Sequence, residues 1–135
     1  MEYRFANLND LGILASRDHW ISEEMLKKAV EQERVLIAEE DGVFAGWLRY
    51  GLFWDEIPFM NMLRLREESR GKGFGREFVL FWEDLMKKKE FKQVMTSTSS
   101  AEEAQHFYRR LGYHEVGGFL PAGEPFELIF RKALD

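Results

Sequence analysis

A glycine-rich loop has the clearest potential for chemistry in this sequence. It reads Arg70-Gly71-Lys72-Gly73-Phe74-Gly75 and is followed by Arg76. Glycines at alternate positions allow the backbone to turn several N–H groups toward one point, and a helix that begins there adds the positive end of its dipole. Such donors bind anionic groups. The loop therefore predicts a phosphate site, with Arg70 and Lys72 as charge partners.

Other protein families also bind phosphate with glycine-rich loops, so the spacing must be compared with theirs. A dinucleotide-binding fingerprint reads Gly-x-Gly-x-x-Gly, but Arg76 stands at the sixth position counted from Gly71. A Walker loop continues from Gly-Lys to Ser or Thr, whereas Gly73 follows Lys72. Neither pattern fits. Taken alone, the loop is also compatible with a simple connection between a strand and a helix.

The elements that must position this loop are a strand before it and a helix after it. Residues 59–65 alternate in the manner of a strand. The helix that begins at Phe74 places apolar side chains, Phe78 and Trp82 among them, at three- and four-residue steps, with Glu83 among the charged residues on the opposite face. A buried strand over residues 93–97 should follow and lie parallel to the first strand.

The N-terminal part of the chain predicts one strand, two helices and a hairpin. Residues 2–7 alternate as a half-buried strand, and Asn7 or Asn9 can cap a short helix after it. Ser22 caps a second helix, whose apolar face is predicted to carry Met25, Leu26, Ala29 and Val30. Asp41-Gly42 between two apolar segments is a strong hairpin signal.

The C-terminal part predicts one helix and two strands. Ser100 and Glu103 have the spacing of a capping box, and the helix after them ends at Gly112. Strands are expected over residues 113–119 and 126–132, separated by a loop with two prolines.

Length and composition limit the class of protein. The 135 residues are enough for a single domain, residues 1–135, and the net charge of −5 argues against a nucleic-acid partner. The absence of cysteine excludes disulfides and a thiolate nucleophile, and the three histidines lack ligand spacing, so we expect no metal. No leader pattern and no long apolar run is present, so we expect a soluble, cytoplasmic protein without membrane contact.

Two motifs together resemble the GNAT superfamily of acyl-CoA N-acyltransferases. The first, Arg-x-x-Gly-x-Gly from Arg70 to Gly75, is similar to the pyrophosphate loop of that family. The second, Ala104-x-x-Phe107-Tyr108-x-x-x-Gly112-Tyr113, follows one helix and one strand later. The resemblance implies an α+β, three-layer domain. Its sheet would be mixed and mostly antiparallel, with six to seven strands, about four helices, and splayed parallel strands at the centre.

The resemblance also implies acetyl-CoA as the cosubstrate. The backbone near Leu63 and Leu65 would bind the pantetheine arm and polarise the thioester carbonyl, while the loop would bind the pyrophosphate. Ser99 or Ser100 would replace an Asn that the family often has where this chain has Ala101. The cofactor-binding residues assigned in this way are Leu63, Leu65, Arg70, Gly71, Lys72, Gly73, Phe74, Gly75, Arg76 and Ser100.

The reaction implied is acetyl transfer to a primary amine by direct attack on the thioester. Tyr108 stands at the family's position for serving the departing thiolate, although a core aromatic would fit the same pattern. Glu56, with Asp55 beside it, is the best candidate for the general base, and a solvated turn carboxylate is the other interpretation. His19 and Trp20 either border the acceptor or are, respectively, a solvated and a core residue.

Two alternatives for the function stay open at this stage. A GNAT-fold module that binds CoA without turnover is compatible with Ala101 and with the lack of a carboxylate inside the strand over residues 59–65. An acyltransferase that uses a longer acyl-CoA is compatible with the aromatic residues expected on the acceptor side, in the His19-Trp20 loop and the Phe53-Trp54 turn. The acceptor would be a small molecule or a protein amine, and the protein a monomer or homodimer.

Overall fold

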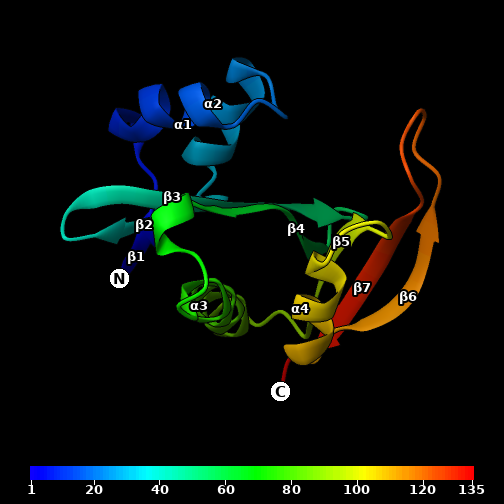
Figure 1. The fold of residues 1–135 in the computed structure, drawn as a ribbon. Coiled ribbons are helices and arrows are strands. Elements are labelled where there is room, and N and C mark those ends of the chain that lie inside the picture. The colour runs from blue at the N-terminus through cyan, green and yellow to red at the C-terminus, as the bar shows by residue number, and fades with distance from the viewer. The chain divides into compact units, whose positions relative to one another are not determined.

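The computed structural model describes all residues from 1 to 135 (Figure 1). One mixed sheet has the strand order β1-β2-β3-β4-β5-β7-β6, in which β4 and β5 are the parallel pair. Seven strands and four α-helices confirm the α+β prediction. Their bounds are β1 (Glu2–Phe5), α1 (Leu11–Arg17), α2 (Glu23–Glu31), β2 (Val35–Glu40), β3 (Val43–Phe53), β4 (Ile57–Leu65), α3 (Phe74–Lys88), β5 (Gln93–Ser99), α4 (Ala104–Arg110), β6 (His114–Phe119) and β7 (Glu127–Ala133).

The chain forms two compact units. The first comprises Met1–Gly51 and Met62–Phe81, and the second comprises Leu52–Asn61 and Trp82–Asp135. Strands β3 and β4 and helix α3 therefore each contribute residues to both units. None of the helices is long and apolar enough to cross a membrane.

In the first unit, helices cover both faces of the strands β1, β2 and β3 (Figure 1). Helices α1 and α2 bury Leu14 and Leu26 against Ile37 and other residues of one face. On the opposite face, the ring of Tyr3 stacks on Phe78 of α3 with centroids 4.7 Å apart. Both faces are apolar because alternate side chains of each strand point to opposite sides.

The Ser22 cap and the hairpin turn predicted for this unit are confirmed, whereas Asn7 caps a 3-10 turn over Leu8–Asp10 and α1 itself begins without a side-chain cap. Ser22 Oγ accepts a hydrogen bond from the N–H of Met25 at 3.2 Å, and the hairpin turns at Asp41 and Gly42, whose φ angles are 54° and 78°. Met25 was expected in the apolar face, but it is 50% exposed. The buried stripe instead consists of Leu26, Ala29 and Val30, since residue 25 lies at its solvent edge.

The second unit contains the predicted parallel pair. Phe59 and Met60 of β4 align with Met95 and Thr96 of β5, and the Thr96 hydroxyl donates to the carbonyl of Met60 at 2.9 Å. Strand β5 also pairs along its whole length with β7, which in turn pairs with β6. The buried strand predicted after α3 is thus confirmed.

Glu83 of α3 was expected on the exposed face of its helix, and this prediction is wrong. The residue is only 3% exposed, and two partners satisfy its carboxylate. The Tyr113 hydroxyl donates to Oε2 at 2.8 Å and Lys132 Nζ donates to Oε1 at 2.8 Å. Paired and hydrogen-bonded, the charge is tolerated inside the unit.

The capping box predicted before α4 is also absent. The helix begins at Ala104, and Ser100 lies in the preceding turn, where its N–H donates to the carbonyl of Phe126 at 2.8 Å. The side chain of Ser99 instead accepts from the N–H of Ala101 at 3.2 Å. This local turn competes with the helix for the same residues. At the other end, Gly112 follows α4 with φ of 92°, as expected for a helix stop.

Candidate functional site

The loop before α3 presents a row of backbone donors. Gly71 and Gly73 have φ angles of 74° and 87°, and a Cβ placed on either would meet no atom within 4 Å. The N–H groups of residues 71–76 donate to no acceptor in the protein, and the first backbone bond of the helix runs from Glu77 to Gly73 at 3.1 Å. Open space at the glycines and unused donors at a helix start are the features that an anion-binding site requires.

Three polar side chains hold the segment that leads into this loop. Arg66 forms an ion pair with Glu40 of β2 at 2.7 Å and donates from Nε to Ser69 Oγ at 2.8 Å. Ser69 is fully buried and donates to the same carboxylate at 3.0 Å. The hydrogen bond from Arg66 is the main cause that lowers the pKa of Glu40. This network fixes the start of the loop without using its glycine amides.

The end of β4 directs its backbone groups in alternating directions. The N–H of Arg66 donates to the carbonyl of Ala45 on β3 at 2.7 Å. Since successive residues of a strand point their polar groups to opposite edges, those of Leu65 and Leu63 point away from β3. The carbonyl of Leu65 accepts from Nε of Arg70 at 2.9 Å. The N–H groups of both leucines therefore point to the edge that the pantetheine arm was expected to use.

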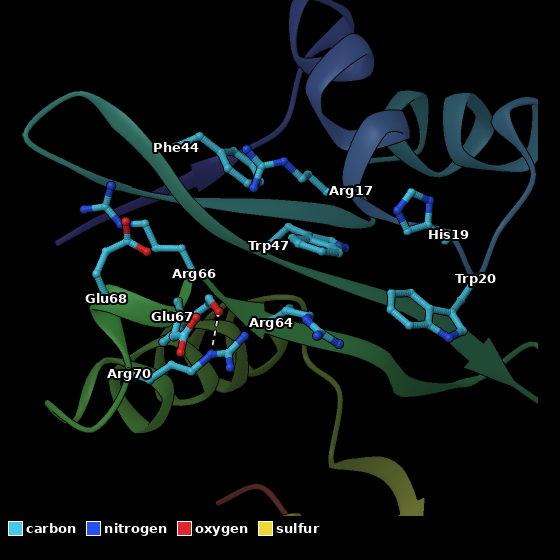
Figure 2. Close-up of a pocket in the computed structure, with 11 residues that line it drawn as sticks. Arg17, His19, Trp20, Phe44, Trp47, Arg64, Arg66, Glu67, Glu68 and Arg70 are labelled. Atoms are coloured by element: carbon cyan, nitrogen blue, oxygen red, sulfur yellow. Dashed lines mark hydrogen bonds between the residues drawn. The ribbon is translucent and has the colours of Figure 1, made fainter.

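A cavity of about 350 Å³ opens beside this strand end, on the side of α1 and α2 (Figure 2). Figure 2 shows His19 and Trp20, which follow α1, on one side of the lining and Arg66 and Glu68 on the other. Trp20 is 61% exposed, so it is not a core residue. The lining is completed by Arg17, Phe44, Trp47, Arg64, Leu65, Glu67 and Arg70.

Tyr108 lies in the second unit, on α4. It is 7% exposed, and its ring packs edge-on against Tyr113 with centroids 5.7 Å apart. Burial is the main cause that raises the pKa of this phenol to about 12. The phenol is therefore protonated at neutral pH and available as a donor.

Comparison with known proteins decides the family. The profile of the acetyltransferase (GNAT) family matches residues 6–113. The chain belongs to the GNAT family.

Solved structures share the GNAT fold of this chain at low identity. Ribosomal-protein-alanine N-acetyltransferase from Brucella melitensis has a TM-score of 0.81 at 19% identity, covering 99% of this chain and 100% of its own. PaiA N-acetyltransferase from Thermoplasma acidophilum, in complex with coenzyme A, has a TM-score of 0.79 at 18% identity, covering 98% of each chain. YncA from Salmonella typhimurium, with its cofactor acetyl-CoA, has a TM-score of 0.81 at 18% identity, covering 100% of this chain and 94% of its own. The sequence matches no curated protein.

The structure of this GNAT chain places the expected site residues in both units. The first unit brings together Leu63, Leu65 and the loop from Arg70 to Arg76, whereas Glu56, Ser100 and Tyr108 belong to the second. The Glu56 carboxylate is exposed and forms no ion pair.

The turn before Glu56 contains Trp54, whose φ of 58° is a strained angle for a bulky side chain. Trp54 is 76% exposed.

A buried ion pair that the sequence did not reveal positions the segment after α1. Asp18 is 2% exposed and Arg49 of β3 is 7% exposed, and Arg49 Nε donates to Asp18 Oδ2 at 2.8 Å. Trp47 Nε1 donates to the same oxygen at 3.1 Å, and the N–H of Trp20 donates to Oδ1 at 3.3 Å. Asp18 thus holds one side of the cavity in place. Its side-chain partners lie far along the sequence, so no local pattern signals them.

Replacing Asp18 by Asn should lower the free energy of unfolding by about 3–5 kcal/mol, because Arg49 would be left buried without its counter-charge. Urea unfolding followed by circular dichroism measures this. Asp84 provides the matched control, since its pair with Lys88 at 3.0 Å is exposed, and Asp84→Asn should cost less than about 1 kcal/mol. Equal losses in the two variants would show that Asp18 does not hold the segment.

Proposed function

We propose that this chain, acting as one catalytic domain over residues 1–135, transfers the acetyl group of acetyl-CoA to a primary amine. The observation that carries this proposal is the row of unused N–H donors from Gly71 to Arg76 beneath open space at the start of α3. A pyrophosphate supplies the anionic oxygens that such donors need. CoA and acetyl-CoA in the PaiA and YncA structures support the same cosubstrate here.

Each part of the cosubstrate has residues assigned to it in this proposal. The pyrophosphate binds the amides of residues 71–76, with Lys72 and Arg70 supplying positive charge nearby. The pantetheine arm follows the N–H groups of Leu63 and Leu65, and one of these amides polarises the thioester carbonyl as a fixed oxyanion donor does. Ser100 is the proposed additional contact near α4.

Besides the making and breaking of bonds, the reaction requires one group that takes a proton from the amine and one that donates to the departing sulfur. The amine nitrogen attacks the carbonyl carbon, the C–S bond breaks, and the products are an amide and the CoA thiol. Glu56 is the proposed base that takes the proton from the amine nitrogen. Tyr108 is the proposed donor to the departing sulfur.

The pKa of Tyr108 limits how it serves the sulfur. Burial raises that pKa to about 12, whereas an ordinary thiol has a pKa of about 8.5. Complete transfer of the phenolic proton to the thiolate is therefore uphill. Tyr108 acts in this proposal by donating a hydrogen bond that strengthens as negative charge develops on sulfur, and solvent supplies the proton afterward.

The test is turnover of acetyl-CoA with a panel of primary amines, followed as release of free thiol, with calorimetric titration of acetyl-CoA alongside. We expect thiol release that depends on the amine, and binding of micromolar order. NAD should give no heat, because the loop lacks the dinucleotide fingerprint. Binding of acetyl-CoA without thiol release for any amine would identify a CoA-binding module. Thiol release only from longer acyl-CoAs would show that the acyl donor is not acetyl-CoA. No binding of any acyl-CoA would refute the proposal.

A further inference from the structure

The cavity beside β4 contains guanidinium groups that lack counter-charges. Arg17, Arg64 and Arg70 all line it, and none of them has a carboxylate oxygen within 4 Å. Arg17 lies over the ring of Phe44 at 5.9 Å and Arg64 over the ring of Trp20 at 5.4 Å. Contacts with aromatic faces restrain these side chains but leave their fork of N–H donors unused.

Two carboxylates and several aromatic rings complete the same lining. Glu67 and Glu68 reach the cavity and take part in no ion pair. His19, Trp20 and Trp47 supply ring surface. A volume of about 350 Å³ is within the size range of small-molecule sites. The lining therefore offers positive charge, negative charge and aromatic surface to one small ligand.

The cavity adjoins the predicted phosphate site and shares Arg70 with it, but its other two unpaired arginines, Arg17 and Arg64, are not assigned to CoA. Alternation along β4 places Met62, Arg64 and Arg66 on one face, and Met62 packs against the cluster formed with α1 and α2. Helix α3, whose first turn carries the glycine amides, packs on the opposite face through Phe78 and Tyr3. Arg64 and the glycine amides therefore lie toward different sides of the end of β4, and Arg17 and Arg64 are available to a ligand other than the CoA pyrophosphate.

We infer that this cavity binds the acceptor, and that the acceptor is a small primary amine that also carries a carboxylate and an apolar or aromatic group. This inference rests on the proposed function. The carboxylate pairs with Arg64 and Arg17, the ammonium group is attracted by Glu67 and Glu68 before it loses its proton, and the apolar group packs near Trp20 and Trp47. Amino acids with large apolar side chains have this combination of groups.

The experiment compares L-phenylalanine, L-tryptophan and L-methionine with their amides, which keep the amine and side chain but lack the carboxylate. The free acids should be the better acceptors, as measured by kcat/KM in thiol release. In Arg64→Gln, KM for L-phenylalanine should rise roughly ten- to a hundred-fold, the loss expected for one charge-assisted hydrogen bond. The KM values for L-phenylalanine amide and acetyl-CoA should stay within about twofold.

Arg110 provides the matched control, because it is exposed on α4 and forms no ion pair. Arg110→Gln should leave all three KM values unchanged. Equal kcat/KM values for the free acids and their amides would overturn the inference. A rise in the KM of acetyl-CoA alone in Arg64→Gln would also overturn it, because the cavity would then bind a phosphate of CoA.

A binding measurement separates this inference from the proposed function. Calorimetry with L-phenylalanine, on protein saturated with CoA, should show binding that Arg64→Gln weakens by the same factor. Binding without thiol release from any amine would refute the transfer reaction and keep the carboxylate site. Thiol release with amides only, and no binding of the free acids, would refute the carboxylate site and keep the transfer reaction.

Discussion

Replacing Tyr108 by Phe should lower kcat roughly ten- to a thousand-fold while the affinity for acetyl-CoA is retained. The substitution keeps the ring, which packs against Tyr113 and Phe130, and removes only the hydroxyl oxygen. Because that hydroxyl is proposed to serve the charge that develops on sulfur, the loss should appear in the rate and not in binding. Steady-state thiol release and calorimetry measure the two quantities separately.

Tyr113→Phe is the matched control for this prediction. Tyr113 is also a buried phenol of the second unit, but its hydroxyl donates to Glu83 at 2.8 Å. Its loss should lower the free energy of unfolding by about 1–3 kcal/mol and leave kcat unchanged. A kcat in Tyr108→Phe equal to that of the native enzyme would assign Tyr108 to the core and leave the thiolate to solvent.

The pH dependence of kcat tests whether the Tyr108 phenol stays protonated. Burial raises its pKa to about 12, so the phenol keeps its proton well above neutral pH. We therefore expect that loss of the Tyr108 proton does not lower kcat at any pH below about 10. A fall that is present in the native enzyme and absent in Tyr108→Phe would show that the phenol loses its proton earlier than its burial allows.

Replacing Gly73 by Glu should weaken acetyl-CoA binding more than about a hundredfold, which corresponds to about 3 kcal/mol. The residue has φ of 87° and open space where its Cβ would stand, so the new carboxylate would occupy the proposed phosphate site with the same charge as the ligand. Calorimetric titration with acetyl-CoA measures the loss. Helix α3 should remain folded, because its buried residues Phe78 and Trp82 are unchanged.

Gly123→Glu controls for backbone strain and charge. Gly123 also has a positive φ, 72°, and a Cβ added there would meet no atom within 4 Å, but the residue lies in the loop between β6 and β7. The same substitution there should leave the affinity for acetyl-CoA unchanged. Native affinity in Gly73→Glu would place the phosphates elsewhere.

The features that the sequence predicted correctly depend on local patterns. The glycine loop, the Asp41-Gly42 turn and the Ser22 cap are each determined by residues within a few positions of one another. Family resemblance extended these local signals to the mixed sheet and its parallel pair. The positions of the glycine amides at the start of α3 therefore followed from spacing alone.

The features that the sequence did not predict depend on partners far along the chain. Glu83 is buried because Tyr113 and Lys132 reach it, and a helical periodicity cannot register such partners. The ion pair of Asp18 with Arg49 and the cluster of arginines in the cavity also bring together residues that are distant in the sequence. The sequence did not decide whether Trp20 is a core residue or a site residue, because the exposure of a large aromatic side chain depends on the tertiary structure.

Binding of the CoA pyrophosphate by the glycine loop is tested most directly by nuclear magnetic resonance of the backbone amides, on ¹⁵N-labelled protein titrated with CoA. We expect the resonances of Gly71, Gly73 and Gly75 to shift as CoA binds. We also expect their exchange with solvent to slow, because these N–H groups, which have no acceptor in the protein, gain phosphate oxygens. If CoA saturates the protein while these three resonances and their exchange rates stay unchanged, the loop from Gly71 to Gly75 does not bind the phosphates of CoA.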